Sequence, residues 1–203
     1  IMGGGSVANC LIQVARLGGR ASWLGKLGDD WISNEIIEQF KDENVDFSFA
    51  IQDAALCSPF NLAVYAGDKS RRVGGFLIPN SLIKLSDKDI ISFASHINKD
   101  DWVIVEIGEI PLDITLRFCQ EVKKRDGNLA VDVDLDPVKQ CIGSAELVKD
   151  IFNISDVLIP NYKAMQTLYS SELSTDNLVK EITEEYNKIT VITAGADGVY
   201  YAK

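Results

Sequence analysis

Residues 102–133 read WVIVEIGEIPLDITLRFCQEVKKRDGNLAVDV. The stretch opens with a short β-branched run at 102–107, which is typical of a buried strand. Pro111 then stands where the first turn of a helix tolerates proline, and apolar residues follow at helical spacing until Gly127 provides a stop. A second apolar run at 129–133 completes the pattern. Strand, helix and strand with short joins predict a parallel βαβ unit with a right-handed crossover.

The same alternation continues on both sides of this stretch. Ser86-Asp87-Lys88-Asp89 is a variant of the capping box, with Asp in the place of the usual Glu, and predicts that a helix begins there. Beyond residue 133 we expect the following elements: a helix near 144–152, a strand at 156–159, a helix from about Tyr162, a helix near 176–187 and a strand at 189–193. Regular alternation over this length predicts an α/β fold.

The N-terminal part of the chain has a different texture. Gly3-Gly4-Gly5 leads into an apolar helix that ends at Gly18-Gly19, and a strand at 21–24, a loop at 25–30 and a second helix follow. Two strand-like runs, 60–67 and 73–78, are joined by turn-forming residues and predict a hairpin. A hairpin added to an α/β core often covers a binding site, so we expect lid elements at about 21–24 and 55–78.

The composition excludes several classes of function. The net charge of −10 over 203 residues argues against a nucleic-acid partner, since phosphate binding needs a concentrated basic surface. The longest apolar runs are too short to span a bilayer, and no export signal opens the chain. The four cysteines have no metal-ligand spacing, so no metal site is predicted from them. Cys10, Cys119 and Cys141 lie in or beside helical patterns, so a reduced, cytoplasmic location is expected. The abrupt start on Ile1-Met2-Gly3 suggests that the sequence has been cut.

The glycine cluster is the first candidate for a ligand site. Glycine lets the backbone approach a ligand closely, a helix N-terminus offers free N–H donors, and Asn9 lies one turn further on. A plain tight turn before a helix explains the cluster about as well. Gly3-x-Gly5-x-x-Ala8 also matches the dinucleotide fingerprint, with Asp29 and Asp30 at a suitable distance. Asp30 would more simply cap the helix that follows it.

Longer motifs carry a resemblance to a known family. Gly4-Gly5-Ser6-Val7-Ala8-Asn9, Ala15-Arg16-Leu17-Gly18 and Gly25-Lys26-Leu27-Gly28-Asp29-Asp30 together resemble the N-terminal signature of the ribokinase-like (PfkB) kinases. Similar matches run to the end of the chain: Glu109-Ile110-Pro111, Asp132-Val133-Asp134-Leu135-Asp136-Pro137, Pro160-Asn161 and Thr193-Ala194-Gly195-Ala196-Asp197-Gly198-Val199. The resemblance therefore covers nearly all of the sequence.

The resemblance implies a three-layer α/β/α fold over residues 1–203, with a mostly parallel central sheet and a small β lid. It implies ATP-dependent phosphorylation of an alcohol group on a sugar or nucleoside, with ATP and Mg²⁺ as cofactors. Exposed lid strands would also favour a homodimer. The residues implied for the substrate are Gly4, Gly5, Asn9 and Glu109; those for the nucleotide are Asn161, Thr193, Gly195 and Gly198; and Asp132 and Asp134 are further acids of the site.

The chain also departs from the family pattern. The Gly-Ala-Gly-Asp segment that supplies the family's catalytic base would come after Lys203, and the first strand with its sugar-binding Asp would come before Ile1, so no catalytic base is assigned here. Ala164 replaces the Glu of the family's Asn-x-x-Glu motif, and Asp134 and Asp136 replace an Asn and an Arg. An acid at 136 would disfavour carboxylated or phosphorylated substrates. Two alternatives to a kinase remain: a non-catalytic relative that binds a sugar or nucleotide, and, less well supported, a dinucleotide-binding oxidoreductase domain.

Overall fold

The computed structural model describes residues 5–65, 72–78, 85–108, 110–133, 143–169 and 172–203, with the backbone alone for 60–65 and 72–78. The chain forms two compact units, Ile1–Leu85 and Ser86–Lys203. Gly4, Glu109, Asp134 and Asp136 lie outside the described residues.

The second unit is built on a five-stranded sheet in the order β5-β6-β7-β8-β9. The first four strands run parallel and the last antiparallel to its neighbour. This confirms the predicted α/β fold with a mostly parallel sheet. The strands are β5 (Trp102–Ile107), β6 (Asn128–Val133), β7 (Val157–Pro160), β8 (Ile189–Thr193) and β9 (Val199–Ala202).

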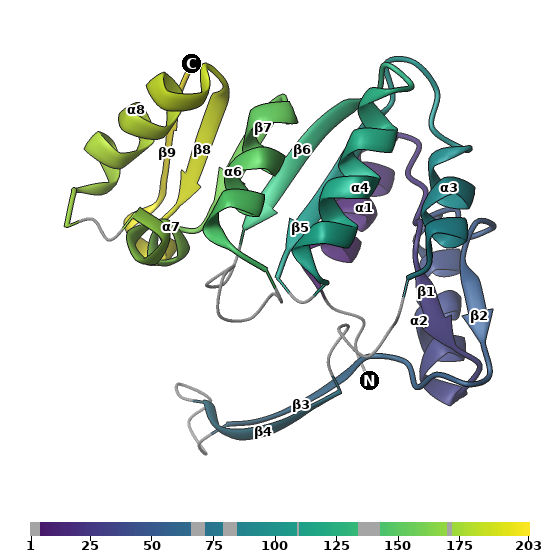
Figure 1. Cartoon of the computed structure of the whole chain (residues 1–203). Helices are drawn as coiled ribbons and strands as arrows, with labels where there is room; N and C mark the ends of the chain where they lie inside the picture. The colour runs from purple at the N-terminus through teal and green to yellow at the C-terminus, as the bar shows by residue number, and fades with distance from the viewer. Residues whose placement is uncertain (1–4, 66–71, 79–84, 109, 134–142, 170–171) are drawn as a thin grey trace. The chain divides into compact units, whose positions relative to one another are not determined.

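Helices connect the four parallel strands and lie over one face of this sheet, whereas a short turn joins β8 to β9 (Figure 1). Apolar side chains from alternate strand positions pack beneath them, as Leu129, Val131 and Val133 of β6 do. The intervening positions, such as Asp132, therefore point to the opposite face. The helices are α3 (Asp87–Ala94), α4 (Leu112–Lys123), α6 (Ala145–Ile154), α7 (Tyr162–Tyr169) and α8 (Thr175–Tyr186).

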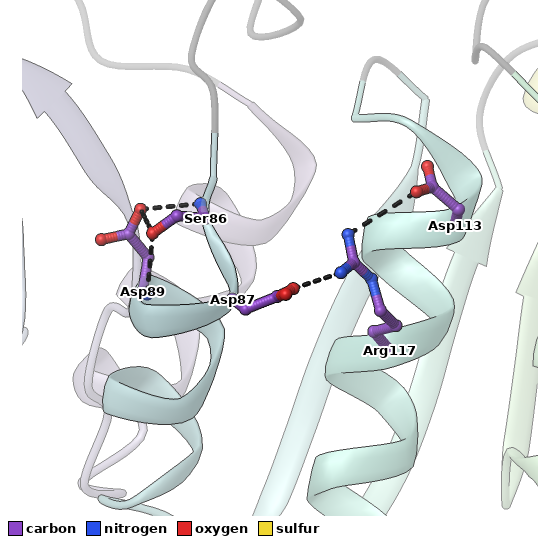
Figure 2. Close-up of polar contacts among 5 residues, drawn as sticks. All are labelled: Ser86, Asp87, Asp89, Asp113 and Arg117. Carbon is purple, nitrogen blue, oxygen red and sulfur yellow. Dashed lines mark hydrogen bonds and ion pairs between the residues drawn. The ribbon is translucent and has the colours of Figure 1, made fainter.

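Helix α3 begins with the capping box that the sequence predicts. The Ser86 Oγ accepts a hydrogen bond from the Asp89 backbone N–H at 3.2 Å, and the Asp89 carboxylate accepts one from the Ser86 N–H at 2.8 Å (Figure 2). Arg117 of α4 pairs with Asp87 of α3 and, at 3.6 Å, with Asp113 (Figure 2). These three side chains are exposed, so the pairs contribute little to stability.

The described residues of the first unit form two helices and two small sheets. Helix α1 (Ser6–Arg16) and helix α2 (Trp31–Asp42) pack around a small apolar cluster of Ile12, Ala21, Phe40 and Val45. Strands β1 (Lys26–Gly28) and β2 (Ile51–Asp53) pair in parallel, and β3 (Phe60–Tyr65) and β4 (Arg72–Ile78) form the predicted antiparallel hairpin.

The strand expected at 21–24 is wrong. Ser22 forms only an isolated bridge with Asp46, and the paired strand lies further on, inside the expected 25–30 loop. Ala21 and Trp23 are apolar at alternate positions because both pack against the small cluster, not because they belong to a continuous ladder. A fifth strand of the large sheet, β9, had no counterpart in the sequence prediction. In the described part of the chain, no helix combines the length and apolarity needed to cross a membrane.

Candidate active site

The residues expected at the nucleotide meet at the carboxyl ends of β7 and β8. Asn161 directly follows β7 and forms an isolated bridge with Thr193, the last residue of β8. Its backbone N–H donates to the Val133 carbonyl at 2.7 Å, which holds it at the end of β6 as well. The structure therefore brings Asn161 and Thr193 together at one edge of the sheet, where α/β proteins commonly bind ligands.

The side chain of Asn161 also begins helix α7. Its Oδ1 accepts a hydrogen bond from the Lys163 N–H at 2.9 Å, and its carbonyl accepts one from Met165 at 3.1 Å. These bonds serve backbone donors of the first helical turn that would otherwise lack partners. The hydrogen bond to Lys163 fixes the orientation of the Asn161 side chain and leaves its NH₂ group at the edge of the sheet.

Gly195 and Gly198 form the turn that follows Thr193. Their φ angles are +59° and +96°, which L side chains adopt only with strain, and the Ala194 N–H closes the turn on the Gly198 carbonyl at 2.9 Å. A Cβ added at either glycine would meet no atom within 4 Å. The turn is thus exposed backbone with open space around it, and it continues the edge formed by Asn161 and Thr193.

Asp132 lies near the carboxyl end of β6, beside an acid that the sequence analysis missed. The strand register places Glu106 of β5 directly opposite Asp132. Both are half-buried, and alternation puts both on the face away from the helices. The sequence did carry a signal for Glu106, because Val103, Val105 and Ile107 alternate with it and belong to the core. Asp134 and Glu109 lie outside the described residues.

Ala164, at the position of the missing family Glu, lies in the core. It is 2% exposed and belongs to the main apolar cluster together with its neighbour Met165. The substitution therefore matches the surroundings of this position, which are apolar.

Gly5 and Asn9 lie at the start of α1 in the first unit. Gly5 has a φ of +100° and is the N-cap residue, and none of the described side chains caps this helix end. The Asn9 N–H donates to the Gly5 carbonyl at 3.0 Å, and both residues are exposed. The exposed helix end offers backbone donors for hydroxyl or anionic groups. Gly4 lies outside the described residues.

The Asp30 carboxylate is occupied by helix capping, and the Cys119 thiol is unreactive. Asp30 is the N-cap of α2, as the simpler reading of its position predicted. Burial raises the pKa of the Cys119 thiol to about 12, so it stays protonated and is no nucleophile. Among the described residues, no group of three or more His, Cys, Asp or Glu side chains is placed to hold a metal ion.

Comparison with known proteins identifies the family. The model of the pfkB family carbohydrate kinases matches residues 2–203. The chain is 26% identical to a ribokinase of Dictyostelium discoideum over 96% of its own length and 64% of the relative's. It is also 32% identical to an aminoimidazole riboside kinase of Salmonella typhimurium, over 65% of this chain and 41% of that protein.

Solved structures show the same fold. A fructokinase from Vibrio cholerae O395, in a form with fructose, ADP and calcium ion bound, matches with a TM-score of 0.76 at 20% identity, over 98% of this chain and 65% of that one. The chain spans less than two thirds of the length of each of these proteins: 64% of the ribokinase, 65% of the fructokinase and 41% of the aminoimidazole riboside kinase. With the family model matching almost the whole chain, the protein belongs to the pfkB family of carbohydrate kinases.

Proposed function

We propose that the protein is an ATP-dependent kinase that phosphorylates an alcohol group of a sugar or nucleoside. The observation that carries the proposal is the assembly of Asn161, Thr193 and the Gly195–Gly198 turn at one sheet edge. The names of the relatives support it, since they are a ribokinase and an aminoimidazole riboside kinase.

The nucleotide would lie along this edge. Phosphoryl transfer depends mostly on positioning and on stabilising charge, and little covalent chemistry is asked of the protein. The turn around Gly195 and Gly198 offers open backbone, and Asn161 offers an amide whose orientation its helix-capping bond fixes. ATP supplies the transferred phosphoryl group, and Mg²⁺ would offset the charge of its phosphates.

The substrate would meet a different set of residues. The uncapped start of α1 at Gly5, with Asn9, would hold its hydroxyl groups. Gly4 and Glu109 belong to the same proposed set, and Asp132 and Asp134 are proposed as further acids. The hairpin β3–β4 would cover the bound substrate and exclude water. The catalytic base of the proposal is not assigned to any of these 203 residues.

Cell location and assembly complete the proposal. Cys10, Cys57 and Cys119 are free thiols, which suits a reduced cytoplasm.

Within the described residues, β3 and β4 pair only with each other, so their outer edges remain for a second copy in a homodimer. Light scattering on the natural protein checks the dimer, and a monomeric mass at working concentration would contradict it.

A kinase assay on the full-length natural protein tests the main proposal. ATP with Mg²⁺ and a panel of ribose, fructose and aminoimidazole riboside should give ADP with at least one acceptor. Calorimetry with each ligand runs in parallel, with NAD as the control ligand. Binding and turnover of none of the sugars, or binding of NAD alone, would overturn the proposal.

A second function is favoured by one observation, the burial of Ala164 where the family has an acid. A relative without that acid would bind a sugar or nucleotide without turnover. The two functions separate in the same experiment, since this relative would show heat of binding for ATP or a sugar but produce no ADP.

A further inference from the structure

The carboxylate of Asp30, which lies between β1 and α2, bonds two other segments of the first unit: the start of α2 and the segment around Ser58. Its Oδ1 accepts a hydrogen bond from the Ser33 N–H at 2.9 Å, which caps helix α2. Its Oδ2 accepts a second bond, from the Ser58 N–H at 2.8 Å. The two oxygens of one carboxylate thus face two different backbone donors, 25 residues apart in the sequence.

Ser58 is held from the other side as well. Its side chain is fully buried, and its Oγ accepts a hydrogen bond from the Gly28 N–H at 3.0 Å. A Cβ on Gly28 would lie 2.4 Å from the Leu56 carbonyl oxygen and 2.8 Å from the Ser58 nitrogen. The segment around Ser58 therefore lies directly against the end of β1, closer than any side chain at position 28 would allow.

Two buried serines of this unit bond the Asp30 carboxylate through their backbone N–H groups. Among the described residues of the first unit, Ser33 and Ser58 are the buried polar side chains, and both are partners of Asp30. Burial disfavours the charged form of Asp30, but the hydrogen bonds from Ser58 and Ser33 outweigh it and hold the pKa of the carboxyl below its usual range. The carboxylate is therefore ionised and able to accept from both sides at neutral pH.

The position of this cluster in the chain gives it a consequence. Ser58 precedes the hairpin by one residue, Pro59, since β3 begins at Phe60. The described backbone of β3 and β4 is paired only within the hairpin, and a two-stranded hairpin alone is marginally stable in water. The placement of the hairpin within the first unit therefore depends on how its root, the segment around Ser58, is held.

We propose that Asp30 is a positioning residue that fixes the root of the hairpin β3–β4, and through it the affinity for the sugar or nucleoside. The second half of this proposal rests on the proposed function, in which the hairpin covers the substrate. Asp30 touches neither reactant. It acts through Ser58.

The substitution Asp30→Asn separates this role from helix capping. An asparagine has one oxygen, which can still accept from Ser33 and cap α2, since Asn is a good N-cap residue. Its NH₂ group would then face the Ser58 N–H, donor against donor. The matched control is Ser33→Ala, which leaves both carboxylate bonds in place. It removes the reciprocal half of the capping box, where the Ser33 Oγ bonds the Asp30 backbone at 2.7 and 3.2 Å, and the 3.3 Å bond that the Oγ accepts from the Gln52 Nε2 of β2.

Hydrogen exchange and calorimetry on the full-length natural protein give the test. In Asp30→Asn, amides of residues 54–65 should exchange about tenfold faster, the scale of one lost hydrogen bond to a charged group. Affinity for the acceptor sugar that the wild type binds best should fall about tenfold, with ATP affinity unchanged. In Ser33→Ala, faster exchange should be confined to α2 and β2, with both affinities unchanged.

Three outcomes would overturn the proposal. Unchanged exchange at 54–65 in Asp30→Asn would leave Asp30 as a helix cap alone. Faster exchange with unchanged sugar affinity would show a structural contact without a positioning role, and equal losses for sugar and ATP would show general destabilisation. A wild type that binds neither ligand would sink the proposed function and with it the affinity half of this proposal, whereas the exchange comparison would still decide the anchoring of the root.

Discussion

At the residue scale, Asn161 caps helix α7 and, in the proposed function, binds ATP; a single substitution separates these two roles. Asn161→Asp keeps an oxygen to accept from the Lys163 N–H, and an acid suits a helix N-terminus, so the free energy of unfolding should change by less than about 0.5 kcal/mol. The new negative charge would face the phosphates of ATP. We expect ATP affinity to fall about tenfold or more and sugar affinity to stay constant, both by calorimetry.

Gln166→Glu supplies the control for this prediction. It introduces the same charge one turn further along α7, where the side chain bonds the Tyr162 hydroxyl. A variant Asn161→Asp that binds ATP as tightly as the wild type would place the nucleotide away from this edge.

The apolar surroundings of Ala164 argue against restoring the Glu of the family's Asn-x-x-Glu motif at this position. Ala164→Glu would put a carboxylate into the apolar core, and we expect the free energy of unfolding to fall by about 2–4 kcal/mol in urea titrations at pH 7. Thr167→Glu, at an exposed position of the same helix, should change it by less than about 0.5 kcal/mol. Unchanged stability together with tighter binding of ATP in the presence of Mg²⁺ would contradict this, since the side chain would then reach the nucleotide.

Single residues also show what the sequence could and could not predict. The caps at Asp30 and Ser86 follow from local hydrogen bonding, and both were predicted. Glu106 was missed because its closeness to Asp132 depends on the register between two strands, which no local pattern contains. Local chemistry is legible in the sequence, whereas cross-strand pairs require the assembled sheet.

The same division holds at the scale of elements. Helices and parallel strands of the second unit begin within about two residues of their predicted starts, because each has a strong apolar period. In the first unit, the alternation at 21–24 arises from packing against helices, so the period suggested a strand that does not form a ladder. Strand β9 has only four residues and two exposed apolar side chains, Val199 and Tyr201, so its period is too short to stand out.

Asp156 links three elements of the second unit, the helix α4 and the strands β6 and β7. Its carboxylate accepts hydrogen bonds from the Lys123 ammonium group and from the Leu129 N–H, each at 2.7 Å. These contacts tie the end of α4 to the starts of β6 and β7. Asp156→Ala leaves the Leu129 N–H without its partner and should lower the free energy of unfolding by about 1–2 kcal/mol in urea titrations.

The control is Asp87→Ala, which removes one partner of the exposed Arg117 pair (Figure 2). Surface pairs of this kind contribute about 0–1 kcal/mol, so this variant should lie close to the wild type. Equal effects of the two substitutions would mean that Asp156 acts as an ordinary surface charge and not as a clamp.

At the scale of the whole molecule, the two units differ in how much apolar surface holds them together. The main cluster of the second unit contains seventeen buried residues among those described, and the cluster of the first unit contains four. Stability follows buried apolar area, so the first unit should open more readily than the second. The glycine-rich start of α1 and the hairpin, both assigned to the substrate side by the proposed function, belong to this weaker unit.

Hydrogen exchange of the full-length natural protein, measured with and without each ligand, tests this difference between the units. A ligand that binds only the native state stabilises it by about 2.7 kcal/mol at a hundredfold excess over its Kd. The sugar should therefore slow exchange most in the first unit, around 5–16 and 54–65, where local opening sets the rate. ATP should slow it most at 189–202, around the Gly195–Gly198 turn.

The adenine nucleotide thus serves as the matched control for the sugar, because the two are expected to protect different segments. Protection of both segments to the same extent by either ligand alone would contradict the separate assignment of substrate and nucleotide residues, even if the protein proves to be an active kinase.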